Sequence, residues 1–526
     1  MQYHFLLLFL IIVIVIETEG SSSTEYFVPA SEISGLEYIF NSTGGVSWSW
    51  KNNDTQTKWS FPPATSPCEE QDTWQGLKCA CIPNTTNYFC QITNIDLSGY
   101  SLVGSIPHQI SLLSNMISLT LSNNRLVGTN IQFGCMLPLL YSFEIGNSGL
   151  TGTIPACYYQ TSNLVTLNLN GNYLGGSIPP ELGELLHLTS LSFGHNRIGG
   201  TIPTMLCQLD DLSLLDMSVN LLSGSVPACL GLIPSLKFIS INYNHLTGTL
   251  SPNLFLSDSL ESIYVGVNSL DGSLPANVWQ LDNLWVLDVA NNSFTGTLPR
   301  VFPRTLQILW MNNNALKGSI PTALGDATGL VQLKLEGNSF TSSIPAALGL
   351  LPKLMYFDVS GNNLVGEVPT SFGHATALSY FYFSHNALSG PGTSLPSFVS
   401  ASVSDLDMSF NNFVGVFPFN TTGKNLKNLY VRGNRLSGTI PDANLAILET
   451  VIKLDLSVNS FSGTVPSALS MVCVNISGLR HCVIDNTYYS YSVPLCFVTC
   501  INQLLLYCRL QTLRCYCWLK TGFMAV

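Results

Sequence analysis

Charged residues are scarce in this chain of 526 amino acids. Asp, Glu, Lys and Arg together make up 10% of it, whereas a soluble protein usually contains about 25%. The 20 basic residues are outnumbered by 31 acidic ones, which gives a formal net charge of −11. The basic surface that holds nucleic-acid phosphates is therefore missing, and a nucleic-acid partner is excluded. The hydrophobic content of 46% also excludes an extended disordered chain.

The chain also lacks an apolar run of the length that crosses a bilayer, which takes about 20 residues. Phe5 to Ile16 are all apolar, and Glu17 to Ser23 follow as a polar segment with small residues. This pattern predicts a secretory signal peptide over residues 1–20, although the usual basic residue is missing from its start; an uncleaved anchor or a buried strand is the alternative. Secretion predicts an extracellular or cell-surface location and leaves membrane attachment open. Six sequons are candidate glycosylation sites: Asn41, Asn53, Asn84, Asn291, Asn420 and Asn475.

From about Ile92 the chain repeats the pattern Leu-x-Leu-x-x-Asn-x-Leu-x-Gly-x-Ile-Pro. We refer to the Asn position of each unit as its anchor. Sixteen anchors can be placed, most of them 24 residues apart. A chain of 526 residues would ordinarily suggest three or four globular domains, but this constant repeat predicts one continuous array. The anchors are residues 100, 124, 148, 172, 196, 220, 244, 268, 292, 314, 338, 362, 386, 411, 434 and 459.

Each part of the pattern has a physical role. The apolar pair five and three residues before the anchor, such as Leu167 and Leu169, points inward from a short strand, because side chains alternate along a strand. The anchor amide satisfies backbone groups that the following turn would bury unpaired. Gly four residues later permits a bend at positive φ, and the Ile-Pro step favours extended backbone. One unit cannot bury its apolar side alone, but stacked units can, which predicts a solenoid.

The pattern resembles the leucine-rich repeat (LRR), in the 24-residue form found in plant receptors and receptor-like proteins and, similarly, in protist surface antigens. The segment Asn172-Tyr-Leu-Gly-Gly-Ser-Ile-Pro179 matches it closely, and Glu37–Gly45, Trp48 and Asp72–Cys79 resemble that family's N-terminal cap. The resemblance implies an α/β repeat fold: a right-handed LRR solenoid, horseshoe or superhelix, with a parallel β-sheet on the concave face and disulfide caps. The expected regions are a signal peptide (1–20), an N-terminal cap (21–91), sixteen repeats (92–466), a C-terminal cap (467–500) and a Cys-rich tail of unknown role (501–526).

The cysteines number fifteen, an odd count. The resemblance implies bridges Cys68–Cys79 and Cys81–Cys90. Within the array, Cys135 and Cys157 are 22 residues apart, as are Cys207 and Cys229, so each pair lies almost one turn apart on the convex side, within disulfide reach. The alternative is that these four are small buried apolar residues. Cys473 and Cys482 fit the C-terminal cap. No CxxC motif occurs, and we expect no metal and no cofactor.

The outward residue four before each anchor forms a column on the concave face. Seven of its members are acidic, and its aromatic members begin only with the eighth of the sixteen units. Tyr and Trp are favoured on binding surfaces, so we expect a binding strip there. The alternative is that strands tolerate aromatics because of their β-propensity. The candidate binding residues are Tyr264, Trp310, Tyr356, Tyr380, Tyr382 and Tyr430.

No catalytic residue is identified. The acidic residues of the column are never adjacent, and no Gly-x-Ser-x-Gly elbow occurs. We therefore expect a non-enzymatic extracellular protein that binds a protein, peptide or glycan through the LRR surface. One alternative is a structural or adhesive coat protein of the cell surface. A second is a secreted inhibitor of a glycan-degrading enzyme.

Overall fold

The computed structural model describes residues 25–51, 56–63, 66–69, 73–84, 87–128, 131–394, 398–417, 425–440 and 450–463, together with the backbone of three short segments at 473–475, 483–484 and 487–488. The chain divides into two compact units. Unit 1 contains residues up to 128 together with 132–149, and unit 2 contains 129–131 and everything from residue 150. The predicted signal peptide (1–20) and the Cys-rich tail (501–526) lie outside the described residues.

Unit 1 contains one α-helix and an antiparallel strand pair. Helix α1 starts after Pro29 and buries Leu36 and Ile39. Strand β2 pairs antiparallel with β3, and β3 then pairs in parallel with β5, as β5 does with β7. The elements of unit 1 are β1 (Tyr26–Phe27), α1 (Ala30–Ser42), η1 (Gly45–Ser47), β2 (Leu77–Pro83), β3 (Tyr88–Asp96), β4 (Val103–Gly104), η2 (His108–Leu112), β5 (Ser118–Thr120), β6 (Arg125–Leu126), η3 (Gln132–Met136) and β7 (Ser142–Glu144), where η marks a 3-10 helix.

The start of unit 1 is held together by tryptophans and by one buried carboxylate. The Trp48 and Trp59 rings lie 5.0 Å apart, and Trp59 lies 5.9 Å from Trp74. Glu32 of α1 is buried, and its Oε2 accepts a hydrogen bond from the Ile92 amide at 2.8 Å. Desolvation raises the pKa of Glu32. The Glu32 hydrogen bond ties α1 to β3, which pairs with the repeat strand β5.

Unit 2 is built on one parallel sheet, which we call the main sheet. Each successive strand pairs in parallel with the strand one repeat later, and the middle residue of each described strand is buried. The strands are β9 (Thr166–Asn168), β11 (Ser190–Ser192), β13 (Leu214–Asp216), β15 (Phe238–Ser240), β17 (Ser262–Tyr264), β19 (Val286–Asp288), β21 (Ile308–Trp310), β23 (Gln332–Lys334), β25 (Tyr356–Asp358), β27 (Tyr380–Tyr382), β29 (Asp405–Asp407), β31 (Asn428–Tyr430), β33 (Lys453–Asp455) and β35 (Cys473–Asn475).

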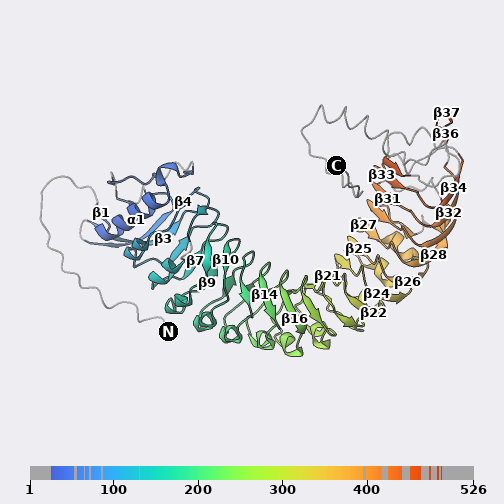
Figure 1. The fold of residues 1–526 in the computed structure, drawn as a ribbon, viewed down its shortest axis with the longest axis horizontal. Coiled ribbons are helices and arrows are strands. Elements are labelled where there is room, and N and C mark those ends of the chain that lie inside the picture. Colours follow the sequence, from blue (N-terminus) through green and yellow to red (C-terminus); the bar gives the residue numbers. More distant parts are fainter. Residues whose placement is uncertain are drawn as a thin grey trace, which may run out of the picture. The chain divides into compact units, whose positions relative to one another are not determined.

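A second series of short parallel strands follows the anchors, and the sequence analysis did not predict it. In Figure 1, strands β25, β27, β31 and β33 of the main sheet line the inner side of the curve within unit 2, while β26, β28 and β34 lie away from it. The second series comprises β8 (Thr151–Thr153), β10 (Tyr173–Gly175), β12 (Gly199–Gly200), β14 (Leu221–Gly224), β16 (His245–Thr249), β18 (Ser269–Asp271), β20 (Thr295–Gly296), β22 (Ala315–Ser319), β24 (Ser339–Ser342), β26 (Asn363–Gly366), β28 (Ala387–Pro391), β30 (Asn412–Val416), β32 (Arg435–Thr439) and β34 (Ser460–Ser462).

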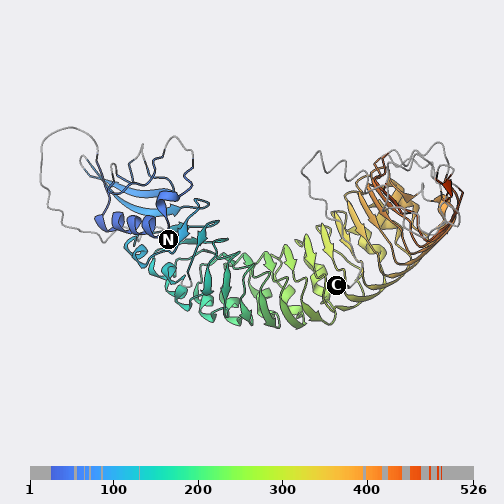
Figure 2. The ribbon, with the colours of Figure 1, turned by 45° about the horizontal axis from the view of Figure 1, so that its top comes forward.

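Short 3-10 helices close most repeats of unit 2 on the side away from the main sheet (Figure 2). Most begin directly after the Pro that ends the repeat pattern and follows Ile, Val or Leu. This Pro adopts extended backbone as predicted, for example at Pro203 and Pro345 of Ile-Pro steps. They are η4 (Ala156–Gln160), η5 (Pro180–Glu184), η6 (Thr204–Gln208), η7 (Ala228–Leu232), η8 (Pro252–Phe255), η9 (Ala276–Gln280), η10 (Thr322–Asp326), η11 (Ala346–Leu350), η12 (Thr370–His374) and η13 (Gly392–Ser394). A hairpin of β36 (Val483–Ile484) and β37 (Thr487–Tyr488) completes the described elements.

The anchor residues act as the sequence predicts. The Asn220 side chain accepts a hydrogen bond from the Ile198 amide at 2.9 Å and donates to the Phe193 and Met217 carbonyls at 3.0 and 3.3 Å. The contact with the amide of the preceding repeat recurs at all fourteen anchor asparagines. Each buried anchor therefore ties one repeat to the one before it.

The inward apolar pair and the bend after the anchor are also confirmed. Leu167 and Leu169 are fully buried. The Gly four residues after each anchor has a positive φ, such as 78° at Gly248, and Ser342 adopts 69° at the one position where Gly is replaced. The repeat is thus a leucine-rich-repeat solenoid unit, whose helical part in most described repeats is a short 3-10 helix.

Candidate functional site: an aromatic and acidic strip on the main sheet

The candidate aromatic residues all point outward from the main sheet. Each three-residue strand has one inward and two outward side chains, so the sheet carries two outward columns, six and four residues before the anchors. Tyr264, Trp310, Tyr382 and Tyr430 stand in the second column, and Tyr356 and Tyr380 in the first. We call the outward residues of β21–β31 the strip.

Three tyrosines of the strip form one cluster. Tyr356 is in register with Tyr380 of the next strand, and their ring centroids lie 5.5 Å apart. Tyr382 lies 5.6 Å from Tyr356 in an edge-on arrangement and 6.3 Å from Tyr380. Tyr380 is 41% exposed, so the cluster offers ring surface to a partner. Such ring pairs combine apolar contact area with a polar hydroxyl.

A lysine of the main sheet connects this cluster to Trp310. The Nζ of Lys334 lies 4.5 Å from the centroid of the Trp310 ring and 5.0 Å from that of Tyr356. The Nε1 of Trp310 donates a hydrogen bond to Oε1 of Gln332 at 3.2 Å. An ammonium group between two ring faces is attracted by both π-systems. Trp310, Lys334 and the tyrosine cluster therefore form one continuous surface.

Two of the candidate residues stand apart from that surface. Tyr430 lies two strands beyond Tyr382, with Asp407 in register between them. Tyr264 packs against Phe238, with ring centroids 5.5 Å apart, and is separated from Trp310 by Asp288. The structure thus brings together four of the six candidates, namely Trp310, Tyr356, Tyr380 and Tyr382. Tyr430 follows on the far side of Asp407, and Tyr264 belongs to a separate contact with Phe238.

Carboxylates alternate with the rings, and burial shifts their proton affinity. Asp288 is 7% exposed and Asp358 is 8% exposed, and their Oδ1 atoms accept hydrogen bonds from the Ala290 and Ser360 amides at 3.0 and 2.9 Å. Desolvation raises the pKa of Asp288 to about 6 and also raises the pKa of Asp358. Desolvation and the charge of Asp358 raise the pKa of Glu336 to about 7.

The same carboxylates affect the tyrosines. Desolvation, followed by the charges of Asp358 and Glu336, raises the pKa of Tyr356 to about 12. Desolvation and the neighbouring Asp405 raise the pKa of Tyr382 well above its usual range. The phenols therefore stay neutral at physiological pH and act as rings and hydrogen-bonding groups, with no anionic role.

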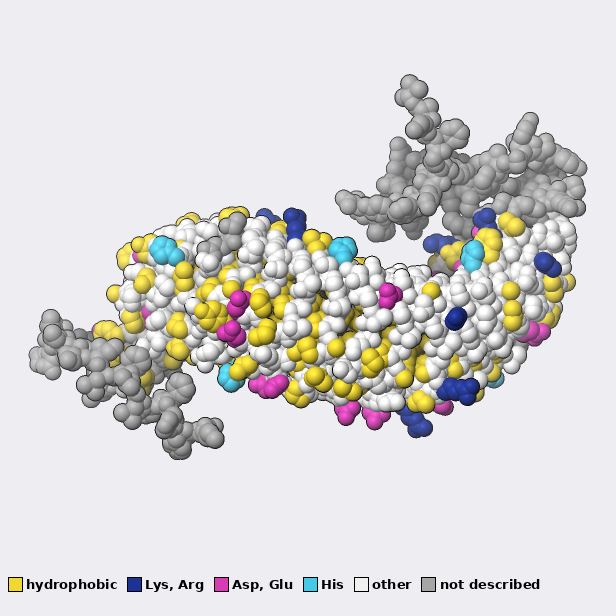
Figure 3. Space-filling view, turned by 60° about the horizontal axis from the view of Figure 1, so that its bottom comes forward, with side chains coloured by type: hydrophobic (Ala, Val, Ile, Leu, Met, Phe, Trp, Pro, Cys, Tyr) yellow, Lys and Arg dark blue, Asp and Glu magenta, His cyan; other side chains and the backbone are white. Residues whose placement is uncertain are grey.

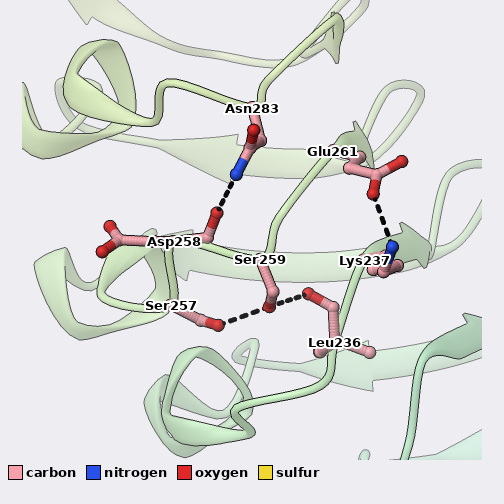
Figure 4. Close-up of polar contacts among 7 residues, drawn as sticks. All are labelled: Leu236, Lys237, Ser257, Asp258, Ser259, Glu261 and Asn283. Carbon is pink, nitrogen blue, oxygen red and sulfur yellow. Dashed lines mark hydrogen bonds and ion pairs between the residues drawn. The ribbon is translucent and has the colours of Figure 1, made fainter.

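Outside the strip, the described residues contain few charged groups in contact with one another. Figure 3 shows one face on which charged side chains are sparse and separated, among uncharged polar and hydrophobic ones. Within the described ranges the one ion pair joins Lys237 to Glu261 at 2.9 Å, both on the surface (Figure 4). The described residues contain no group of three His, Cys, Asp or Glu that could hold a metal ion. In the part of the chain that the structure covers, no helix has the length and apolar character of a membrane span.

Unit 1 has a hollow that sequence reasoning missed. Lys51, Gln75, Asp96, Tyr100 and Thr120 are among its lining residues. The Nζ of Lys51 lies 4.7 Å from the Tyr100 ring centroid. Gln75 is buried, and its side chain already bonds to the Lys51 backbone, donating to the carbonyl at 2.8 Å and accepting from the amide at 3.1 Å. Because its buried amide is paired within the protein, we assign no ligand to this hollow.

The cysteine candidates take these positions in the structure. Bonds join Cys68 to Cys79 and Cys81 to Cys90 in unit 1, and Cys207 to Cys229 on the neighbouring helices η6 and η7. Cys135 and Cys157 are each disulfide-bonded as well. The side chain of Cys473 and all of Cys482 lie outside the described residues.

The glycosylation candidates remain predictions. Asn41, Asn84 and Asn291 are exposed, as a glycan requires. The side chain of Asn291 also accepts a hydrogen bond from Nδ2 of Asn313 at 3.0 Å, at the edge of the main sheet. Asn53, Asn420 and the side chain of Asn475 lie outside the described residues.

Comparison with known sequences identifies the repeat. The profile described as Leucine Rich Repeat matches residues 163–185, 187–209, 283–304, 353–375 and 425–444. A Brassinosteroid LRR receptor kinase of Solanum lycopersicum is 43% identical over 56 residues, which cover 11% of this chain and 5% of that protein. The Systemin receptor SR160 of Solanum peruvianum matches to the same extent. The match thus spans only a small part of these curated relatives.

Solved structures of plant receptors share the fold. The plant peptide hormone receptor RGFR1, in complex with RGF2, has a TM-score of 0.69 at 28% identity, over 77% of this chain and 68% of that one. The LRR ectodomain of the membrane receptor kinase GASSHO1/SCHENGEN3 from Arabidopsis thaliana, in complex with CASPARIAN STRIP INTEGRITY FACTOR 2, has a TM-score of 0.64 at 29% identity, over 73% of this chain and 49% of that one. The repeats of this chain are therefore of the kind found in plant extracellular LRR receptor ectodomains.

Proposed function

We propose that this leucine-rich-repeat chain is an extracellular recognition protein that binds a peptide through the strip and catalyses no reaction. The observation that carries the proposal is the uneven distribution of outward side chains on the main sheet. From β9 to β15 the second column holds Asn168, Ser192, Asp216 and Ser240, and the one outward aromatic residue of these strands is Phe238 in the first column. From β21 to β31 it holds Trp310, Tyr382 and Tyr430, joined by Tyr356 and Tyr380 in the first column.

β-propensity alone does not explain this distribution. The strands of both halves have the same length, the same parallel pairing and the same buried middle residue. A demand of the fold for aromatic outward residues would act equally on both halves. Aromatic residues are enriched where a protein surface is covered by a partner. A partner that covers β21–β31 accounts for the concentration of outward aromatics on those strands, beside the separate contact between Phe238 of β15 and Tyr264 of β17.

A peptide is the ligand class that the comparisons favour. Two receptors with the same fold are described in complex with RGF2 and with CASPARIAN STRIP INTEGRITY FACTOR 2, and the first is described as a peptide hormone receptor. Extended peptides expose alternate side chains, which suits a flat strip of rings and carboxylates. A location outside the cell agrees with the disulfides of both units.

The test is capture of peptides by secreted, tagged protein from extracellular fluid. The double variant Trp310→Ala/Tyr382→Ala removes two rings of the strip, and we expect it to lose at least about tenfold in affinity, since rings at an interface centre each contribute about 1–2 kcal/mol or more. The control is Tyr243→Asn, because Tyr243 is 55% exposed at a positive-φ turn that Asn tolerates. Unchanged capture by the double variant would remove the strip, and absence of any saturable peptide would favour a coat role.

A further inference from the structure

One tryptophan of unit 2 is exposed outside the strip. Trp285 directly precedes β19 and is 36% exposed, an exposure that no other tryptophan of the described ranges reaches. The next residue, Val286, is fully buried. Among the described residues the indole of Trp285 forms no hydrogen bond and no ring contact. The ring face and the indole N–H are therefore both available to a ligand.

The backbone places Trp285 between two polar residues of neighbouring repeats. The Trp285 amide donates to the Glu261 carbonyl at 2.9 Å, and the Trp285 carbonyl accepts from the Gln307 amide at 2.8 Å. Glu261, Trp285 and Gln307 thus stand side by side, each seven residues before its anchor, at the edge where the strands of the main sheet begin. The carboxylate of Glu261 is already paired with Lys237 at 2.9 Å (Figure 4). No unneutralised charge therefore comes from that side.

An open hollow of about 480 Å³ lies beside the indole. Its lining residues are all uncharged, and they are Asn283, Trp285, Thr305 and Gln307. Asn283 donates to the Asp258 carbonyl at 2.9 Å (Figure 4), which leaves its side-chain oxygen as an acceptor. The Thr305 hydroxyl donates to two backbone carbonyls at 2.8 Å each, so its oxygen also remains an acceptor. The side-chain amide of Gln307 has no hydrogen-bond partner among the described residues and offers both a donor and an acceptor.

The hollow adjoins the shortest repeat of the array. Anchors 292 and 314 are 22 residues apart, and the described residues between β20 and β21 contain no 3-10 helix, unlike most repeats of unit 2. Thr305 and Gln307 come from the end of this shortened segment. This part of the molecule therefore has a surface that the other repeats do not reproduce, as a site for one particular ligand requires.

The chemistry of the hollow matches a neutral sugar. A pyranose with equatorial hydroxyls has an apolar face of C–H groups, which packs flat on an exposed indole, while the hydroxyls at its rim both donate and accept hydrogen bonds. The amide and hydroxyl groups around Trp285 supply both kinds of partner. A charged ligand would find no counter-ion among these lining residues. A proline-rich peptide docks between several aromatic side chains, whereas this hollow contains a single ring.

We propose that Trp285, Asn283 and Gln307 form a second binding site, separate from the strip, for a neutral oligosaccharide of equatorially linked pyranoses. One sugar ring stacks on the indole, and its hydroxyls bond to the side chains of Asn283 and Gln307. Because the hollow is open to solvent, it suits a chain that lies flat across the surface, and equatorial linkages produce such a flat chain. This site goes beyond the proposed function and does not depend on it.

The experiment titrates the full chain with cellohexaose, whose glucose units are equatorially linked, and measures the dissociation constant by calorimetry. Trp285→Ala should weaken binding at least about tenfold, as the loss of a central aromatic anchor does, whereas Trp285→Phe keeps a ring and should lose about threefold or less. Gln307→Ala should weaken binding about threefold. Maltohexaose has the same composition but a coiled chain, and we expect it to bind at least about threefold more weakly. Absence of saturable cellohexaose binding, or equal binding of the two sugars, would overturn the proposal.

Two further variants locate the sugar. Tyr141→Ala is the matched control, because Tyr141 is also an aromatic residue seven positions before its anchor and is 52% exposed. An equal loss in Tyr141→Ala would mean that the sugar adheres to any exposed ring, and it would overturn the proposal. Trp310→Ala/Tyr382→Ala should bind cellohexaose as the unmodified protein does, and a loss in this variant would place the sugar on the strip and also overturn it. If Trp285→Ala loses captured peptides while its affinity for cellohexaose is unchanged, Trp285 extends the strip, so the proposed function stands and this inference fails.

Discussion

The ammonium group of Lys334 lies 4.5 Å from the centroid of the Trp310 ring, on the outward face of neighbouring strands β23 and β21. The same ammonium group is 5.0 Å from the Tyr356 ring of the next strand. One side chain thus joins two aromatic residues that are separated by 46 positions in sequence. This contact defines where the strip begins, and it provides the first test of the strip's charge.

Replacing Lys334 should raise the pKa of the carboxylates around it. Desolvation raises the pKa values of Asp288 and Glu336, and the charge of Lys334 opposes this effect at both. Lys334→Gln removes that charge, so we expect the pKa of Asp288 to rise above about 6 and that of Glu336 above about 7. The measurement is an NMR titration of the carboxyl carbons in selectively labelled protein.

The matched control for Lys334 is Lys237→Gln. Lys237 is exposed, it pairs with Glu261 at the start of neighbouring strands (Figure 4), and its replacement changes the net charge of the protein equally. Similar pKa shifts in both variants would mean that these carboxylates sense only the overall charge of the protein.

Glu336 should make stability fall as pH rises. Its pKa is raised to about 7 by desolvation and by Asp358, so the folded protein holds a proton that the unfolded chain releases near pH 4.5. The stabilisation is complete below about pH 4.5 and is lost as the pH rises through about 7. Discounted for its partly exposed position, this contribution is about 1–2 kcal/mol.

The thermal midpoint of Glu336→Gln, compared with the unmodified protein between pH 5 and 8, measures that contribution. We expect the variant to gain in relative stability with increasing pH, because Gln carries no charge to bury. Glu261→Gln serves as control, since Glu261 is exposed and paired with Lys237. A difference between Glu336→Gln and the unmodified protein that does not change with pH would contradict the prediction.

An anchor asparagine should contribute far more to the free energy of unfolding than a surface asparagine does. Asn220→Ala leaves the Ile198 amide and the Phe193 carbonyl buried without their partner. Each unsatisfied buried group costs about 1–3 kcal/mol, so we expect a loss of about 2–4 kcal/mol. Asn283→Ala removes one exposed hydrogen bond to the Asp258 carbonyl (Figure 4) and should cost about 0.5–1.5 kcal/mol at most. Comparable thermal midpoints for the two variants would refute this account of the anchor.

The Cys207–Cys229 bond should stabilise the repeats that it joins. Its cysteines are 22 residues apart. Closing a loop of that length lowers the entropy of the unfolded chain, which stabilises the folded protein by about 3 kcal/mol in the chain-entropy model. We expect Cys207→Ser/Cys229→Ser to lower the thermal midpoint and to increase proteolysis near η6 and η7. Proteolysis that is unchanged in the double variant would show that stacking alone holds these turns.

Much of the fold could be predicted because each repeat restates the same local rules. The alternation of Leu167 and Leu169, the anchor amides and the Gly at positive φ depend on residues a few positions apart. The second series of strands was missed, although its signal lies in the Leu-x-Gly-x-Ile segment. Those strands exist only because neighbouring repeats present matching edges, as when His245 pairs with Ser223. One repeat alone gives no periodicity that distinguishes such a strand from a turn.

The sequence by itself determined the repeat, its register and the side of the sheet on which each aromatic stands, because a period of 24 residues and strand alternation leave no other choice. Only the tertiary structure decided which of those aromatics act together. Stacking placed Tyr356 against Tyr380 and Tyr382, put Lys334 over Trp310, and left Tyr264 against Phe238. The tertiary structure also decided which carboxylates are buried and thereby desolvated. Asp288 and Asp216 occupy the same position of the repeat, but Asp288 is buried by its neighbouring strands whereas Asp216 is only half-buried. Burial and ring contact depend on the residues of adjacent turns, and these are distant in sequence.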